Sequence, residues 1–301
     1  MELLTAFLEA AVRASLPIAL AAIGETISER GGFINVGLEG AMIAGAFAAT
    51  VGGVAMGTVA GYAAGAAGGA VVGAVLCAVA VVGRANQILA GTAVTAGALG
   101  VTALLGHAVF GATGVSLSVP LSAPVGVPLL ERLPMLGQAL FTQPLITYVV
   151  VLLVPGCAWW LSRTRPGLAV RATGENPEAV RAAGLSPVAL QAMGVMAGCA
   201  LGGLGGATLV LAQAGTFAEG MTAGRGFIAL AVVALGRWQP MGVALAALLF
   251  GSSLSLQYVL QAMGTEAPYQ AFLALPYLLT LWVLAAGRRG AAPAWLGRPL
   301  P

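Results

Sequence analysis

The chain has 301 residues, of which 59% are hydrophobic and only 8% are charged, and its mean hydropathy is +0.96. Soluble proteins average about 45–50% apolar and about 25% charged residues, so this composition excludes a water-soluble fold. All thirteen basic residues are arginine, and the formal net charge is +3. In a membrane protein this excess is typical of arginine-rich cytoplasmic loops, so it does not indicate nucleic-acid binding.

Apolar runs divided by charges and turn residues predict an all-α integral membrane protein with about nine transmembrane helices, in a range of about eight to ten. Several runs are short or interrupted by glycine, so we expect short or broken helices among them. One transmembrane domain, residues 1–301, accounts for the whole chain. The expected spans are 5–23, 38–57, 59–82, 87–110, 143–162, 189–212, 226–237, 240–260 and 270–287.

The distribution of arginine predicts the orientation in the membrane. Positively charged loops remain in the cytoplasm, which places the connection 163–188 and the C-terminal tail there. An odd number of spans then puts the N-terminus and the long segment 111–142 outside. The residues behind this prediction are Arg163, Arg165, Arg171 and Arg181 in the connection and Arg288, Arg289 and Arg298 in the tail, with Trp159, Trp160, Trp238 and Trp282 near the inner interface.

Two glycine series recur at every fourth position and so lie along single helix faces. Helices associate closely in lipid where such small residues remove side chains from the contact, so both series predict helix packing. The series are Gly57, Gly61, Gly65, Gly69 and Gly73, and Gly194, Gly198, Gly202 and Gly206.

A short internal echo predicts inverted repeats. Gly32-Phe33-Ile34 opens the second span and Gly226-Phe227-Ile228 opens the seventh. In the expected topology these two helices run in opposite directions, as in transporters whose repeats meet at a site near the membrane midplane.

The segment Arg171–Gly184 predicts a short cytoplasmic helix. Asn176 is a good N-cap, Pro177 suits the first helical position, and Gly184 can take the left-handed conformation after the last turn. A helix of about two turns is marginal in water, so it needs a surface to dock against. An ordinary solvated loop is the alternative.

Three motifs, in order, resemble one family of transporters. Residues 171–184 are similar to the coupling loop of ATP-binding cassette (ABC) importer permeases, in which Glu-Ala and a later glycine precede a returning helix. Residues 27–40, Ile-Ser-Glu-Arg-Gly-Gly-Phe-Ile-Asn-Val-Gly-Leu-Glu-Gly, and residues 224–240 resemble the two signatures of the ribose/branched-chain amino acid group. The closest resemblance is to the simple sugar and purine nucleoside branch, and the short length is similar to its smaller permease subunit.

This resemblance implies the partners and the location of the chain. It implies a separate ABC ATPase that holds ATP-Mg, a second and larger permease in a heterodimer, and an extracytoplasmic substrate-binding lipoprotein. It also implies a multi-pass protein of the cell inner membrane with a cytoplasmic C-terminus and no cofactor of its own. The residues implied to couple to the ATPase are Arg171, Glu175, Asn176, Pro177, Glu178, Ala179, Arg181 and Gly184.

Neutral polar side chains in the spans favour a small uncharged solute, and the resemblance favours a purine nucleoside such as guanosine or a simple sugar. Charged side chains near the bilayer, such as Glu25, are tolerable only if paired, solvated or lining a wet cavity. Glu39 and the polar Asn35, one helical turn apart, favour the cavity, whereas Glu29 and Arg30 fit a solvated inner loop equally well. Phe33 could stack on a ring or sugar face, but it also fits a place in the core. The amides of Asn86 and Gln87 could bond to a solute, but they also fit helix caps. The candidate path residues are Phe33, Asn35, Glu39, Asn86, Gln87, Thr92, Thr95 and Phe227.

Other functions fit the residues less well. Riboflavin-like compounds or branched-chain amino acids are alternative substrates. An ion-coupled secondary transporter would need carboxylates or histidine deep in several spans, and Glu is confined to loops after Glu39. An intramembrane serine protease would need a histidine to activate Ser252 or Ser253, but His107, the only histidine, precedes both and has no carboxylate near it in the sequence. We therefore expect a transport subunit without enzymatic activity.

Overall fold

The computed structural model describes residues 2–110, 118–128, 136–262 and 292–300, together with positions 274, 278 and 281. Within these residues, seven helical stretches are long and apolar enough to cross a membrane. The prediction of an all-α integral membrane protein is confirmed. The ninth expected span, 270–287, lies almost wholly outside the described residues, as do Trp282, Arg288 and Arg289.

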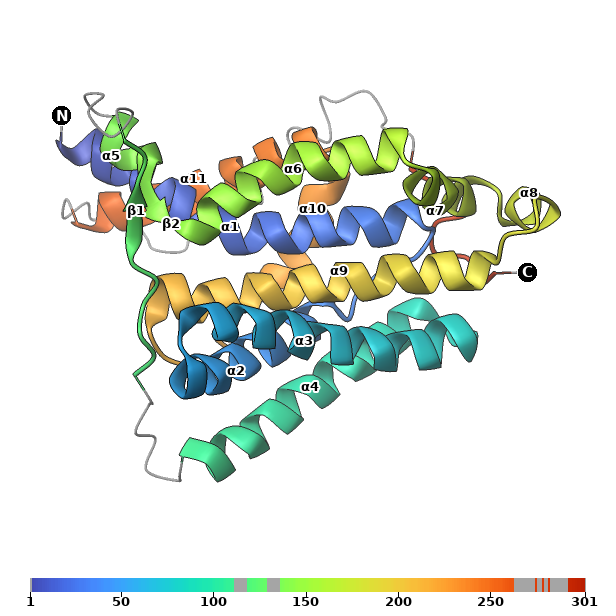
Figure 1. Cartoon of the computed structure of the whole chain (residues 1–301), viewed down its shortest axis with the longest axis horizontal. Coiled ribbons are helices and arrows are strands. Elements are labelled where there is room, and N and C mark those ends of the chain that lie inside the picture. Colours follow the sequence, from blue (N-terminus) through green and yellow to red (C-terminus); the bar gives the residue numbers. More distant parts are fainter. Residues whose placement is uncertain are drawn as a thin grey trace.

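The long helices lie side by side along the long axis of the molecule (Figure 1). Helices α1 and α9 lie centrally, with α2 and α3 against α9, and α11 against α1. Two of the helices end in π-helical turns, η1 after α3 and η3 after α9. The bounds are α1 Glu2–Arg30, α2 Leu38–Met56, α3 Thr58–Leu76, η1 Cys77–Val82, α4 Gln87–Phe110, α6 Leu145–Arg163, α9 Pro187–Leu209, η3 Val210–Ala214 and α11 Pro240–Ala262.

One expected span is far too short to cross the membrane alone. Helix α10, Arg225–Leu235, has 11 residues, or about 16 Å at 1.5 Å per residue, against a bilayer core of about 30 Å. It lies inside the bundle, where it packs against α1, α11 and α2. This confirms the prediction of a broken helix in the second half of the chain.

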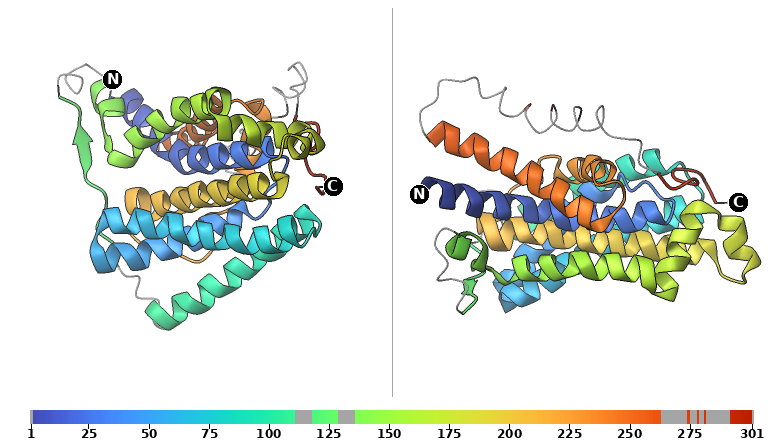
Figure 2. Two further views of the ribbon diagram at one scale, coloured as in Figure 1. Left: turned by 45° about the vertical axis from the view of Figure 1, so that its right-hand side comes forward. Right: turned by 90° about the horizontal axis from the view of Figure 1, so that it is seen from above.

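The two chain ends lie at opposite ends of the bundle (Figures 1 and 2). Two short helices, α7 (Arg165–Glu175) and α8 (Pro177–Ala182), project at the end that holds the C-terminus. We call this the α8 end. The opposite end holds helix α5 (Leu136–Phe141) and two short strands.

The strands are an addition to the fold that the sequence did not predict. β1, Pro124–Gly126, pairs antiparallel with β2, Thr142–Pro144, in the register Val125 to Gln143. β1 falls within the segment 111–142, which we expected to be a long loop, and β2 begins at its last residue and continues into the expected span 143–162. This two-stranded piece is the only sheet among the described residues.

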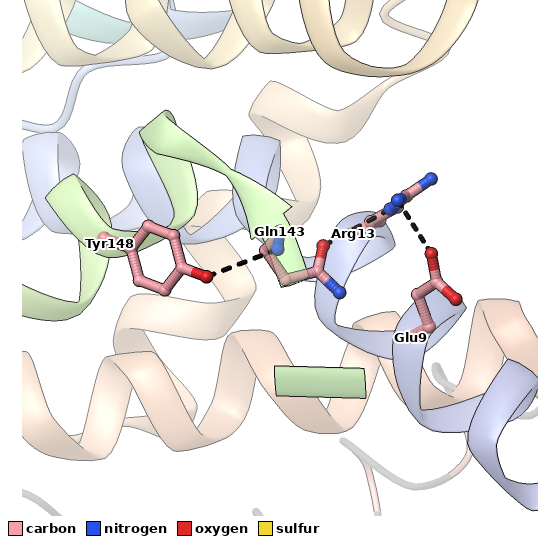
Figure 3. A network of polar contacts seen from close by, with 4 residues as sticks. All are labelled: Glu9, Arg13, Gln143 and Tyr148. Carbon is pink, nitrogen blue, oxygen red and sulfur yellow. Dashed lines mark hydrogen bonds and ion pairs between the residues drawn. The ribbon is translucent and has the colours of Figure 1, made fainter. Parts of the chain in front are cut away.

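Side chains of α1 hold this sheet to the bundle (Figure 3). Arg13 lies 2.7 Å from the carboxylate of Glu9, one helical turn away, and its Nε donates to Oε1 of Gln143 at 3.3 Å. The hydroxyl of Tyr148 in α6 accepts from the backbone N–H of Gln143 and donates to the carbonyl of Val125 at 2.8 Å. The charges at the start of the first span are therefore paired.

Helix α1 is longer than the first expected span, which ended at residue 23. It continues to Arg30 and includes Glu25 and Glu29, both of which are buried. Burial of the two carboxylates is tolerated because each has a hydrogen-bond donor. The N–H of Asn35 donates to Glu25 at 2.9 Å, and the indole of Trp238 donates to Glu29. The interpretation of Glu29 as a solvated loop residue is wrong.

Glycine sets the distance between α2, α3 and α9. A Cβ atom on Gly69 of α3 would lie 2.2 Å from the carbonyl oxygen of Cys199 in α9, and one on Gly206 would lie 1.8 Å from that of Met42 in α2. The predicted α3 series packs against α9 at Cys199 and Gly203, whereas the predicted α9 series faces α1 and α2, so the two series line different contacts. The sequence did not single out Gly203, whose added Cβ would lie 2.3 Å from the carbonyl oxygen of Gly65.

Candidate functional site

Two breaks in the helices meet inside the bundle. Residues 31–37 separate α1 from α2, and residues 215–224 separate η3 from α10. Helix α1 ends at the α8 end, and η3 ends at the opposite end. The chain therefore enters the two breaks from opposite ends of the bundle, and α2 and α10 run in opposite directions (Figure 1). This is the arrangement expected of the internal echo around residues 32–34 and 226–228. We call this region the helix junction.

Glu39, in the first turn of α2, joins the two breaks. Its carboxylate accepts from the hydroxyl of Thr222 at 2.6 Å and from the backbone N–H groups of Gly224 at 2.9 Å and Gly226 at 2.6 Å. The side chain is buried, and it faces the positive end of the α10 helix dipole. A carboxylate there satisfies donors that the first turn of a helix leaves without partners.

Residues 31–37 are held by side chains from α4 and α9. The N–H of Ile34 donates to Gln87 at 3.0 Å, the hydroxyl of Thr95 donates to the carbonyl of Val36 at 3.2 Å, and the amide of Gln191 donates to the carbonyl of Gly31 at 3.2 Å. A buried backbone segment without helical hydrogen bonds needs such partners, because an unpaired buried N–H or C=O group is costly. Two of the candidate path residues, Gln87 and Thr95, therefore support the break directly.

The helix junction keeps unused hydrogen-bonding capacity. Asn35 is fully buried and donates its amide to the sulfur of Cys199 at 3.2 Å, but its Oδ1 has no hydrogen-bond partner among the described residues. The same holds for Oε2 of the fully buried Glu25. Buried polar atoms are usually satisfied, so these two oxygens are available to a proton, a water molecule or a polar solute.

The other candidate path residues lie in different environments. Phe33 is fully buried in an apolar cluster with Leu76, and Phe227 is 44% exposed in the first turn of α10. Asn86 is exposed and caps α4, accepting from the N–H groups of residues 88 and 89. Thr92 is exposed on α4 and donates to a carbonyl of its own helix. The structure thus brings Asn35, Glu39, Gln87 and Thr95 together and leaves these four apart.

The predicted short helix is present at the α8 end. Asn176 caps α8, accepting from the N–H of Ala179 at 3.0 Å, and Gly184 has φ of +79° after the last turn. The N–H of Leu185 closes the turn on the carbonyl of Val180 at 3.2 Å. The sequence did not predict α7 as a separate helix, although its N-cap, Thr164, is of the preferred type and accepts from Gly167.

Helix α8 touches the bundle through few side chains. Pro177 and Val180 are buried, while Glu178, Ala179, Arg181 and Leu185 are exposed. Together α7 and α8 project beyond the ends of the long helices (Figures 1 and 2). We call them the α7–α8 knob. Its exposed surface combines both charge signs with small and apolar residues, which suits contact with another protein.

The end of the chain connects the knob to the helix junction. The N–H of Trp295 donates to the carbonyl of Gly174 in α7 at 2.8 Å, and the N–H of Gly297 donates to the carbonyl of Gly32 at 3.2 Å. Gln87 donates to the carbonyl of Arg298 at 3.3 Å. From the sequence we used this tail only as a source of positive charge. Its contacts run between residues far apart in the chain, which no local pattern reveals.

Comparisons with known proteins agree with this architecture. Residues 7–284 match the family described as the permease component of the branched-chain amino acid transport system. The nucleoside ABC transporter permease protein NupC of Lactococcus lactis is 38% identical over 90% of this chain and 88% of its own length. The guanosine ABC transporter permease protein NupQ of Bacillus subtilis is 32% identical over 98% and 96%. The putative glucose ABC transporter permease protein TsgC13 of Haloferax volcanii is 32% identical over 95% and 92%.

The chain belongs to this family of ABC transporter permeases. The resemblance of the three sequence motifs is confirmed, and the permease is a multi-pass transport subunit rather than an enzyme. ABC systems hydrolyse ATP in a separate ATPase subunit. Membership of this family therefore decides against the ion-coupled transporter and the intramembrane protease. No solved structure matches the permease.

One expectation about His107 is wrong. The sequence places no carboxylate near this residue, but in the permease its Nε2 lies 3.3 Å from the carboxylate of Glu219, in the loop before α10. Both side chains are more than half exposed, so the contact contributes little to stability. In the same loop, Thr222 lies buried against Glu39.

Proposed function

We propose that the permease imports a nucleoside, with purine nucleosides such as guanosine as the first candidates. The observation that carries this proposal is the similarity to two permeases named for nucleoside and guanosine transport along nearly their whole lengths. The helix junction supports it, because its free acceptors, Oδ1 of Asn35 and Oε2 of Glu25, can bind the hydroxyl or amino groups of a neutral solute.

We further propose that the α7–α8 knob docks on the ABC ATPase. The exposed residues of α8 would contact the ATPase, whereas Asn176, Pro177 and Gly184 shape the helix that presents them. Force on the knob would reach the junction by two routes. The first is Gly174, whose backbone lies against that of Arg30 and Gly32. The second is the C-terminal tail, which donates hydrogen bonds to the carbonyls of Gly174 and Gly32. The coupling set is Arg171, Glu175, Asn176, Pro177, Glu178, Ala179, Arg181 and Gly184.

The proposed path passes the helix junction and includes the predicted residues Phe33, Asn35, Glu39, Asn86, Gln87, Thr92, Thr95 and Phe227. In this conformation Asn86, Thr92 and Phe227 expose side chains, which fits a path that a second permease completes. Phe33 is enclosed and would reach the path only after the junction rearranges. The complex would be a heterodimer with a larger permease in the cell inner membrane. The cytoplasm would hold the α8 end, and a substrate-binding lipoprotein would meet the opposite end.

A simple sugar is the second candidate substrate. The similarity to the putative glucose permease, 32% over 95% of this chain, favours it specifically. Sugars and nucleosides both present ring hydroxyls, so the neutral acceptors of the junction do not separate them.

Uptake in reconstituted vesicles tests the substrate. With the permease, its ATPase, its partner permease and its binding protein reassembled, we expect ATP-dependent accumulation of labelled guanosine and no accumulation with ADP. Unlabelled adenosine or inosine should compete, whereas glucose and leucine in equal excess should not. ATP-dependent uptake of glucose or leucine in place of guanosine would overturn the nucleoside proposal and leave the assignment to the permease family intact.

A further inference from the structure

A cavity of about 330 Å³ lies at the α8 end, where α1, α6 and α7 meet the turn between α10 and α11. Its walls include the guanidinium groups of Arg30 and Arg171, the hydroxyl-bearing Ser162, and Trp238. Leu161 and Met241 contribute apolar surface. The cavity is separate from the helix junction and from the proposed path, although Arg171 also belongs to the proposed coupling set.

Among the residues that the structure describes, those that line the cavity carry two positive charges, Arg30 and Arg171, and no negative one. Arg30 uses its Nε to donate to the carbonyl of Trp238 at 2.9 Å, which leaves its two terminal nitrogens directed elsewhere. Neither those nitrogens nor any nitrogen of Arg171 has a hydrogen bond or ion pair within the described part of the chain. No carboxylate is among the described residues that line the cavity. Glu29 and Glu175 lie outside this lining: Glu29 accepts from Trp238, and Glu175 accepts from the N–H of Ala294 and attracts Arg30 from a distance without forming an ion pair with it.

Two guanidinium groups on one cavity repel each other unless an anion lies between them. Their planar N–H forks match the oxygens of a phosphate group, to which arginine often donates two parallel hydrogen bonds. The cavity also meets the first residues of α11, Pro240 and Met241, where the helix dipole is positive. Charge, donor geometry and dipole therefore all select a phosphate group.

The surroundings of the cavity indicate that this phosphate belongs to a lipid. Arg30 ends α1, and Ser162 lies at the end of α6, so the cavity is level with the ends of membrane-spanning helices. Next to the cavity, α11 exposes the apolar side chains of Met241 and Leu245, which are 57% and 69% accessible. Such a surface accommodates an acyl chain, and basic pockets between transmembrane helices bind acidic lipid headgroups. We propose that this cavity binds the phosphate group of an anionic phospholipid.

Lipid retention by the purified permease tests the proposal. The permease would be placed in nanodiscs of phosphatidylglycerol and phosphatidylcholine, extracted in mild detergent, and examined by native mass spectrometry. We expect selective retention of phosphatidylglycerol by the natural chain. We also expect Arg171→Gln and Arg30→Gln each to weaken it about tenfold, because each removes charged hydrogen bonds to the phosphate. Arg84→Gln is the matched control, since Arg84 is exposed, does not line the cavity and changes the net charge equally.

The possible outcomes separate the sources of phosphate. Equal retention of both lipids, or an equal loss in Arg84→Gln, would overturn the lipid site. Binding of inorganic phosphate that depends on Arg30 and Arg171, without any preference for phosphatidylglycerol, would replace the lipid with a soluble phosphate. Because Arg30 also holds the α10–α11 turn, Arg30→Gln is scored only if its thermal unfolding matches the natural chain; otherwise Arg171→Gln alone decides.

Discussion

Replacing Gly206 with alanine is expected to destabilise the permease by about 3 kcal/mol or more, the upper end of the cost of overpacking. The added methyl group would lie 1.8 Å from the carbonyl oxygen of Met42 and 2.7 Å from its carbonyl carbon. Both are backbone atoms of α2, so no side chain can rotate away, and α2 and α9 must separate. The measurement is thermal unfolding of the purified permease in detergent, together with the yield of monodisperse protein.

Gly156→Ala is the matched control for this experiment. Gly156 lies in α6, and an added Cβ there meets no atom within 4 Å. Because alanine is favoured over glycine in a helix by about 1 kcal/mol, this variant should be at least as stable as the natural chain. Equal stability of the Gly206→Ala variant and its control would show that the α2–α9 contact does not depend on glycine.

Glu39→Gln is expected to destabilise the permease by about 2–4 kcal/mol and to reduce uptake strongly. Glutamine keeps one acceptor oxygen, but its amide nitrogen would face the N–H of Gly224 or Gly226, both of which now donate to the carboxylate. The first turn of α10 then loses both a charge and a hydrogen bond. Unfolding temperature in detergent and ATP-dependent uptake in vesicles measure the two effects.

Glu219→Gln separates a specific role of Glu39 from the loss of any carboxylate. The Glu219 side chain is 55% exposed and meets only His107, so this variant should unfold at the temperature of the natural chain. If Glu39→Gln behaves like Glu219→Gln, the carboxylate of Glu39 does not hold α2 to α10.

Local chemistry explains which parts of the structure the sequence predicted. Asn176 and Gly184 specify the start and end of α8 through caps that involve neighbouring residues only, so the short helix was found as expected. The glycine series along α3 and α9 were found because helical periodicity puts every fourth residue on one face. The short span at residues 226–237 was also visible, because Arg225 precedes it and Arg237 and Pro240 mark its end.

The contacts that define the candidate site are of a different kind. Glu39 meets residues 183 to 187 positions further along the chain, and Trp295 bonds to Gly174, which precedes it by more than a hundred positions. Pairing at such separations depends on the fold, and a single sequence gives no signal for it. The same reason explains why the sequence left a solvated Glu29 open as an alternative: its donor, the indole of Trp238, lies 209 positions away.

The central claim is that the α7–α8 knob is the surface on which the ATPase docks. A photo-crosslinking amino acid at Glu178, exposed on α8, tests it most directly in the assembled transporter, with the same group at Glu219 at the other end of the bundle as control. We predict that light links position 178 to the ATPase subunit and that position 219 gives no ATPase adduct. An ATPase adduct from position 219, or none from position 178 in a transporter active in uptake, would contradict the account.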